Sequence, residues 1–211
     1  HTLALHDLTG FNGRCDAIVL SDDPALCPPD GGDALAEFRR ELTWKAVRED
    51  GTDYDLIVVG GGVAGVCMAL AAKRTGSRVL LIHDRDVLGG CNSSEVRVCM
   101  GGGINLPPYE KLGSVVKQIA PIMGDPGIFG GEYYEDNRKK QAFEVACDQW
   151  SGGKDGAYRL ALGERVVDQT MEDGRITSVT TVDIHTGMRT RYRGRLFADC
   201  TGDATVARRA G

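Results

Sequence analysis

Residues 54–92 read YDLIVVGGGVAGVCMALAAKRTGSRVLLIHDRDVLGGCN, and this stretch decides the fold. Leu56–Val59 is a short apolar, β-branched run of the kind that forms a buried strand. An apolar, alanine-rich helix is expected over Val63–Lys73, and a second buried strand over Arg78–Ile82. A strand, a glycine turn, a helix and a strand in this order predict a dinucleotide-binding βαβ unit.

The turn after the first strand fills the pattern G-x-G-x-x-G with Gly60, Gly62 and Gly65. Gly60 lets the chain leave the strand sharply, Gly62 lets a pyrophosphate approach the backbone, and Gly65 lets the helix lie against the sheet. The free N–H groups at the helix start, near Val63 and Ala64, and the helix dipole favour a negatively charged diphosphate. The sequence therefore predicts a bound dinucleotide.

Two neighbouring residues are candidates for binding the ribose. An Asp or Glu is expected about 20 residues beyond the glycines. His83 stands there, followed by Asp84 and Arg85. Asp84 would bind the ribose from one residue later, or His83 would hydrogen-bond a hydroxyl itself. The departure weakens an NAD interpretation.

The following stretch, DRDVLGGCNSSEVRVCMGGGIN at residues 84–105, resembles the flavin loop of the glutathione-reductase-like flavoprotein superfamily. More narrowly, LGG-x-NSSEVRV-x-MGGG is similar to the FAD-dependent oxidoreductases, whose members often occur beside polysaccharide-degrading machinery. The match extends to GRLFADCTGDATVARRAG at residues 194–211, so it covers residues 54–211. The resemblance implies FAD as cofactor and an α/β, Rossmann-like three-layer fold with an inserted antiparallel β-meander.

The resemblance also implies a function, hydride transfer to the flavin from a carbohydrate or another hydroxylated small molecule. Two alternatives stay open at this point. One is an NAD-dependent dehydrogenase, against which the loop at residues 89–97 and the late Thr201-Gly202-Asp203 count. The other is a non-catalytic protein in which a flavin fold serves as scaffold beside a carbohydrate-binding module.

By the same resemblance, cofactor contacts come from several places in the chain. The loop after the second strand would run beneath the ribitol and the flavin ring, and the backbone at Val166 or Val167 would meet the adenine. Thr201-Gly202 would lie close to the phosphates, and could equally cap the next helix. The expected cofactor contacts are Gly60, Gly62, Val63, Ala64, Gly65, His83, Asp84, Arg85, Gly89, Gly90, Cys91, Asn92, Ser93, Ser94, Val166, Val167, Thr201, Gly202 and Asp203.

Glu95 and Arg97 are the candidate catalytic residues, since they sit in the loop expected to face the flavin ring. In an extended segment residues two apart point the same way, so the two could form an ion pair. Such a pair would serve catalysis, or it would simply hold the loop together.

Composition narrows the classes of partner. Lys and Arg number 25 against 30 for Asp and Glu, a net charge of −5, and no basic patch appears, so nucleic acid is not an expected partner. No apolar run approaches the ~20 residues of a membrane span. Seven cysteines show neither CxxC nor zinc spacing, so no metal site is expected.

Residues 1–50 are expected to form a β-hairpin with a strand at 17–20, a Pro- and Gly-rich linker and a short helix over Ala34–Leu42. The hairpin resembles the end of a β-sandwich module, or is a simple N-terminal extension. Residues 51–211 would be the N-terminal portion of an FAD-binding domain, cut before its substrate domain. We therefore expect the rest of the polypeptide, or a second chain, to complete the fold around a small-molecule substrate, in an exported or a cytoplasmic protein.

The remaining elements follow from periodicity and turn residues. Helices are expected over Tyr109–Ala120 and Glu132–Trp150; strands are expected over Tyr158–Val167, Arg175–Ile184, Met188–Arg193 and Arg195–Cys200.

Overall fold

The computed structural model describes residues 18–30, 32–43, 46–98, 100–101, 106–111, 113–119 and 158–211. The chain divides into two compact units, His1–Lys45 and Ala46–Gly211. In the first unit, α1 (Gly32–Thr43) is the expected short helix, with Asp33 in its first turn, where a carboxylate interacts favourably with the helix dipole. Residues 18–20 are not in a strand, and the rest of the expected hairpin lies outside the described residues.

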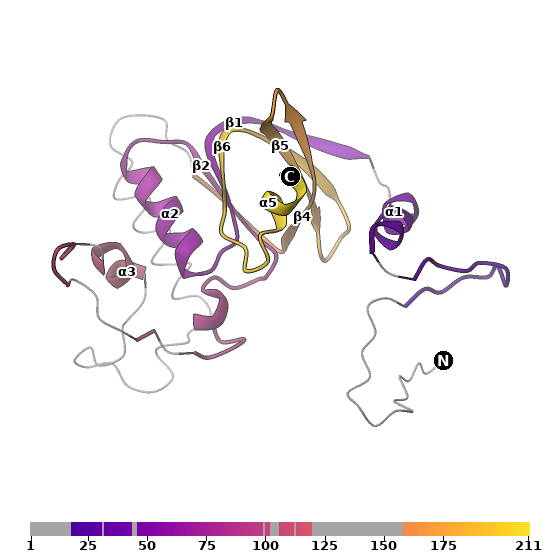
Figure 1. The fold of residues 1–211 in the computed structure, drawn as a ribbon, viewed down its shortest axis with the longest axis horizontal. Helices are drawn as coiled ribbons and strands as arrows, with labels where there is room; N and C mark the ends of the chain where they lie inside the picture. The colour runs from indigo at the N-terminus through magenta and orange to yellow at the C-terminus, as the bar shows by residue number, and fades with distance from the viewer. Residues whose placement is uncertain are drawn as a thin grey trace. The chain divides into compact units, whose positions relative to one another are not determined.

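The second unit is built on a six-stranded sheet with the order β3-β2-β1-β6-β5-β4 (Figure 1). Its strands are β1 (Val47–Val59), β2 (Val79–His83), β3 (Tyr158–Leu162), β4 (Glu164–Glu172), β5 (Arg175–Asp183) and β6 (Arg189–Asp199). β3, β2, β1 and β6 pair in parallel, whereas β4, β5 and β6 form an antiparallel meander. The fold is thus an α/β fold with a mixed sheet, and its βαβ unit is the predicted one.

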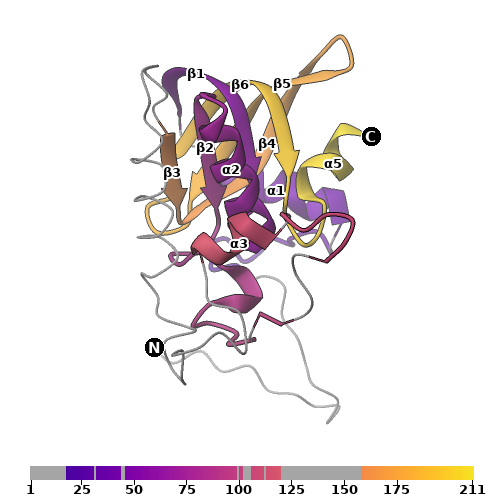
Figure 2. The same ribbon diagram turned by 90° about the vertical axis from the view of Figure 1, so that its left-hand side faces the viewer.

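Apolar side chains cover both faces of the parallel strands. On one face α2 (Val63–Arg74) and α3 (Gly113–Ile119) pack on β1 and β2, as Figure 2 shows for α2. On the other face β4, β5 and α5 (Thr205–Ala210) supply the partners. All five residues of β2 are buried, as expected for a strand that is covered on both faces.

Two strand predictions were wrong in opposite ways. The structure divides the run Tyr158–Val167, which was expected to form one strand, at Gly163. This glycine has a φ of 68° and turns the chain from β3, which pairs in parallel, into β4 of the antiparallel meander. The runs Met188–Arg193 and Arg195–Cys200 are instead one strand, β6, which pairs with β5 in its first half and with β1 along most of its length. The periodicity of apolar residues does not reveal such pairing between segments that are far apart in the sequence.

The remaining boundaries also differ from expectation. β1 begins at Val47, nine residues before its apolar run, because its polar first part pairs with the start of β6. The helix expected from Tyr109 begins at Gly113. The helix expected over 132–150 lies outside the described residues. Within the part of the chain that the structure describes, no helix is long and apolar enough to cross a membrane.

Candidate functional site

The three glycines of the turn between β1 and α2 have different surroundings. A Cβ on Gly60, whose φ is 108°, would lie 2.4 Å from the carbonyl oxygen of Cys200. A Cβ on Gly65 would lie 1.8 Å from the carbonyl oxygen of Gly60. Both glycines are therefore required by the packing of the backbone. A Cβ on Gly62 would meet no heavy atom within 4 Å, so this glycine borders open space.

That open space is a cavity of about 990 Å³ at the carboxyl ends of β1, β2 and β6. The glycine turn forms one wall and the first residues of β4 form another. The loop after β2 is tied to the glycine turn, since the N–H of Gly89 donates to the carbonyl of Gly61 at 2.8 Å. In open α/β sheets, ligands bind at this end of the parallel strands.

Most of the residues expected from the sequence come together at this cavity. Those lining it are Gly60, Gly62, Val63, Ala64, His83, Asp84, Arg85, Gly89, Gly90, Cys91, Asn92, Val166, Val167, Thr201, Gly202 and Asp203. Gly65, Ser93 and Ser94 are not among its lining residues. Ser93 is buried, and its hydroxyl accepts a hydrogen bond from the N–H of Glu95 at 3.2 Å, so it shapes the loop.

Sequence reasoning missed other lining residues, whose positions depend on how distant strands meet. They are Val59, Ile82, Val98, Met100, Glu164, Arg165, Cys200, Thr205 and Arg209.

His83 holds the glycine turn through its Nδ1. Its Nδ1 accepts a hydrogen bond from the N–H of Gly61 at 3.0 Å. Burial is the main cause that holds the pKa of His83 below its usual value, against the opposing charge of Asp84. Nδ1 also lies 3.7 Å from Asp84 Oδ1, but its lone pair already faces Gly61, so we read this contact as proximity and not as an ion pair.

Asp199, which sequence analysis did not single out, organises the Thr201-Gly202-Asp203 turn. Its Oδ1 accepts the N–H and the hydroxyl of Thr201, at 3.0 and 2.6 Å. Its Oδ2 accepts the N–H groups of Val206 and Ala207, both at 2.8 Å. Burial would raise the pKa of Asp199, but these hydrogen bonds outweigh it and hold the pKa below its usual value. The charged carboxylate thus fixes the start of α5 beside the cavity.

A family model described as FAD dependent oxidoreductase matches residues 55–211. The chain belongs to the FAD-dependent oxidoreductase family. Among curated proteins it is similar to an aerobic glycerol-3-phosphate dehydrogenase of Staphylococcus aureus strain USA300, with 38% identity over 69 residues. That match covers 33% of this chain and 12% of the relative, so the chain spans only a small part of the length of the relatives it matches.

Two solved structures are also similar to this chain. The glycerol-3-phosphate dehydrogenase of Bacillus halodurans complexed with FAD shares 11% identity at a TM-score of 0.47, over 76% of this chain and 37% of that one. Mycobacterium smegmatis Sdh1 in complex with UQ1 shares 15% identity at a TM-score of 0.49, over 74% of this chain and 34% of that one.

The cavity lining of this member of the FAD-dependent oxidoreductase family fits the dinucleotide that the family uses. Gly62 and Gly202 both face open space, so a diphosphate could approach the backbone at either place. Asn92 is buried and lines the cavity, and its Nδ2 donates to the carbonyl of Val98 at 2.8 Å. Its Oδ1 is buried without a hydrogen-bond partner among the described residues. A buried acceptor without a partner is costly, and a donor group on a bound cofactor would satisfy it.

The expectation that Glu95 and Arg97 form an ion pair is wrong. The segment forms a turn instead of an extended strand, with Arg97 at φ 61° and its N–H donating to the carbonyl of Ser93. Arg97 Nε donates to the carbonyl of Ser94 at 3.2 Å, whereas Glu95 Oε2 lies 3.9 Å from Arg85. Neither residue is among those lining the cavity.

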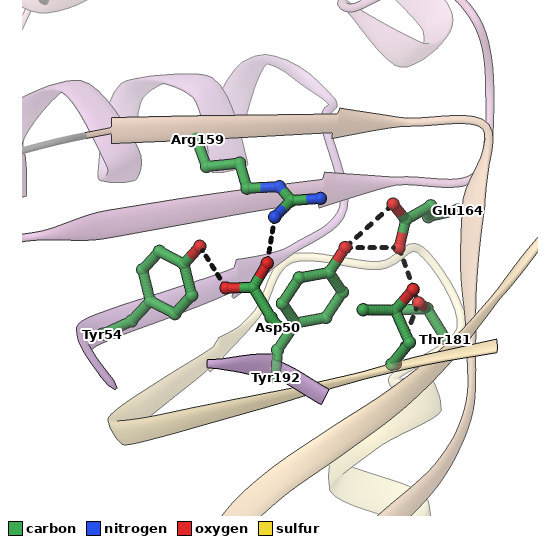
Figure 3. A network of polar contacts seen from close by, with 7 residues as sticks. Asp50, Tyr54, Arg159, Glu164, Thr181 and Tyr192 are labelled. Carbon is green, nitrogen blue, oxygen red and sulfur yellow. Dashed lines mark hydrogen bonds and ion pairs between the residues drawn. The ribbon is translucent and has the colours of Figure 1, made fainter. Parts of the chain in front are cut away.

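A network of polar side chains links the parallel strands with the meander (Figure 3). The side chain of Asp50 in β1 is buried and forms an ion pair with Arg159 of β3. Asp50 also accepts a hydrogen bond from the hydroxyl of Tyr54 at 2.9 Å. The guanidinium of Arg159 lies 5.2 Å from the ring centroid of Tyr192 in β6. The network thereby joins β1, β3 and β6 with charged and aromatic groups.

Proposed function

We propose that this chain is the FAD-binding part of an oxidoreductase that oxidises a hydroxylated small molecule, such as a sugar or a polyol, by hydride transfer to flavin. The observation that carries the proposal is the cavity of about 990 Å³ at the carboxyl ends of β1, β2 and β6, lined by the glycine turn. Family membership supports FAD over NAD. The bound flavin supplies the electron-transfer chemistry, and the protein supplies binding, orientation and electrostatics.

In this proposal the parts of the cavity divide the cofactor among them. Gly62 and the first N–H groups of α2 hold the diphosphate, and Thr201-Gly202-Asp203 lies nearby. The loop at 89–94 runs beneath the ribitol, and Asn92 Oδ1, which has no partner among the described residues, accepts a hydrogen bond from the cofactor. Val166 and Val167 meet the adenine. The cavity lining supports this division because it brings these segments together.

The substrate class is proposed on a narrower basis. The Staphylococcus aureus relative is by its name a dehydrogenase of glycerol 3-phosphate, which is a small molecule with hydroxyl groups. The match covers only 12% of that relative. The class of substrate, a hydroxylated small molecule, is therefore carried over, and glycerol 3-phosphate itself is one member to be tested.

We further propose that additional polypeptide completes the fold beside β6. β5 pairs with Arg189–Arg193 only, so within the described part of the chain the later half of β6 is paired on the β1 side alone. Leu196, in that half, is 66% exposed. An unpaired strand edge with an exposed leucine is a ready surface for another strand.

Anaerobic titration of the FAD-loaded full-length protein tests the proposed activity. We expect the flavin absorbance to bleach on addition of at least one member of a panel of sugars, polyols and glycerol 3-phosphate. Dithionite serves as the control for a reducible flavin. Bleaching by dithionite with no response to the panel would favour the non-catalytic scaffold.

A further inference from the structure

The adenosine end of the proposed site lacks a free carboxylate where one is expected. At the end of β2 stands His83, which is buried and occupied with the N–H of Gly61. The next residue, Asp84, has its Oδ2 at 3.4 Å from Arg165 Nε and its Oδ1 at 3.9 Å from Arg85 Nε. The usual acid that accepts from a ribose hydroxyl is thus absent at residue 83, and the carboxylate that follows already faces two arginines.

A different carboxylate lies beside the same strand end. Leu162, in β3, is the register partner of His83, and Glu164 follows Leu162 by two residues, just past the turn at Gly163. Glu164 is the first residue of β4 and lines the cavity together with His83, Asp84 and Val166. The break between β3 and β4 is what brings this side chain to the carboxyl end of β2.

The Glu164 carboxylate is held by two buried hydroxyl groups, as Figure 3 shows. The hydroxyl of Tyr192 lies 2.9 Å from each carboxylate oxygen, and that of Thr181 donates to Oε2 at 2.6 Å. Both donors have no exposed surface. Burial, then the charge of Glu164, raises the pKa of Tyr192, so its hydroxyl stays protonated and donates. The carboxylate is therefore oriented before any ligand arrives.

An ionised carboxylate offers about four acceptor positions. The Tyr192 and Thr181 protons occupy part of this capacity, and the residue lines the cavity, so acceptor capacity is left for a donor there. We propose that Glu164 accepts a hydrogen bond from a ribose hydroxyl of the adenosine half of FAD, in place of the acid missing at residue 83. This inference rests on the proposed function. Tyr192 and Thr181 are positioning residues that act through Glu164.

Titration of the cofactor-free full-length protein with ADP, 2′-deoxy-ADP and 3′-deoxy-ADP tests this assignment. The wild type should bind one deoxy analogue about tenfold more weakly than ADP, the size expected for a hydrogen bond to a charged group. Glu164→Gln should lose most of this discrimination. Its amide oxygen would face the two hydroxyl donors, and the NH2 group that faces the cavity is uncharged and cannot accept a hydrogen bond from the ribose. Tyr192→Phe should lose part of it, and Thr181→Ser, which keeps the hydroxyl, should retain it.

Two further variants make the outcome specific. Glu172→Gln removes an exposed carboxylate at the far end of β4 and should discriminate like the wild type. Discrimination that persists in Glu164→Gln, is absent from the wild type, or disappears in Asp84→Asn instead would overturn the assignment. If the wild type binds neither FAD nor ADP, the proposed function falls with it; if it binds FAD and only the Glu164→Gln result fails, the proposed function stands.

Discussion

At the scale of single residues, the glycine turn separates folding from binding. Gly60 and Gly65 are fixed by contacts with backbone atoms of Cys200 and of Gly60 itself. Gly62 has ordinary extended backbone angles, φ −65° and ψ 174°, and open space where a side chain would stand. The methyl group of an alanine at 62 would thus enter the cavity, whereas that of an alanine at 60 or 65 would collide with backbone atoms.

This distinction predicts opposite behaviour of two matched substitutions. Gly62→Ala should leave the free energy of unfolding within about 1 kcal/mol of the wild type, because its backbone angles suit alanine. The same variant should bind FAD at least about tenfold more weakly, since the added methyl group enters the cavity. Gly65→Ala should lose about 1–3 kcal/mol of stability or more through overpacking. Urea unfolding and FAD titration measure both, and equal stability losses for the two variants would contradict the distinction.

His83 predicts a dependence of stability on pH. Its pKa is lowered in the folded protein relative to about 6.5 in the unfolded chain, so the unfolded chain binds the proton more readily. The contribution of a neutral His83 is therefore complete above about pH 6.5 and is lost as the pH falls toward the folded-state pKa.

Urea midpoints measured from about pH 7 to pH 5 should fall more steeply for the wild type than for His83→Gln, which does not titrate there. The pKa of His185 is raised, chiefly by its hydrogen bond with Asp86, and its contribution is instead lost as the pH rises. Since both proteins contain His185, the difference between their slopes isolates His83. Parallel slopes would show that His83 is not buried in its neutral form.

At the scale of elements, local pattern predicted the βαβ unit and failed where strands meet. β1, α2 and β2 follow from apolar runs and glycines that are neighbours in sequence. The break at Gly163 and the continuity of β6 are decided by pairing between segments far apart, which a periodicity of two cannot reveal. The same limit explains why Glu164 and Asp199 escaped notice, since each acquires its role only from neighbours that the fold brings to it.

The polar network offers a test of how these strands are held. Asp50→Ala would leave Arg159 without its carboxylate and Tyr54 without its acceptor, and should destabilise the protein by about 1–3 kcal/mol. Asp53→Ala, at an exposed position of the same strand, should stay within about 0.5 kcal/mol. Urea unfolding of both variants measures the difference. Losses of similar size would mean that the network does not stabilise the sheet.

At the scale of the whole molecule, we propose that additional polypeptide completes the fold of this chain. The curated relative is matched over 12% of its length, and β6 presents Leu196 beside an unpaired edge. The sequence predicted most of the cavity lining because the glycine turn and the loop after β2 contain glycines that can be recognised in the sequence. Among the described residues, no strand pairs with the later half of β6 on its β5 side.

Leu196 provides the corresponding prediction. Substitutions at exposed positions usually change stability by no more than about 0.5 kcal/mol. In the full-length protein, Leu196→Asp should lower the thermal midpoint by several degrees, the size that follows from about 1 kcal/mol or more, because added polypeptide covers this leucine. Met171→Asp, at a 37% exposed position in β4, is the control. Equal midpoints for Leu196→Asp and the wild type would show that nothing covers Leu196.

The central claim, that the cavity beside the glycine turn holds FAD, is tested most directly by the absorbance spectrum of the purified full-length protein and by identification of the cofactor that denaturation releases. We expect the two bands of an oxidised flavin and FAD in the supernatant, with both strongly reduced in Gly62→Ala. A colourless protein that does not take up added FAD would contradict it.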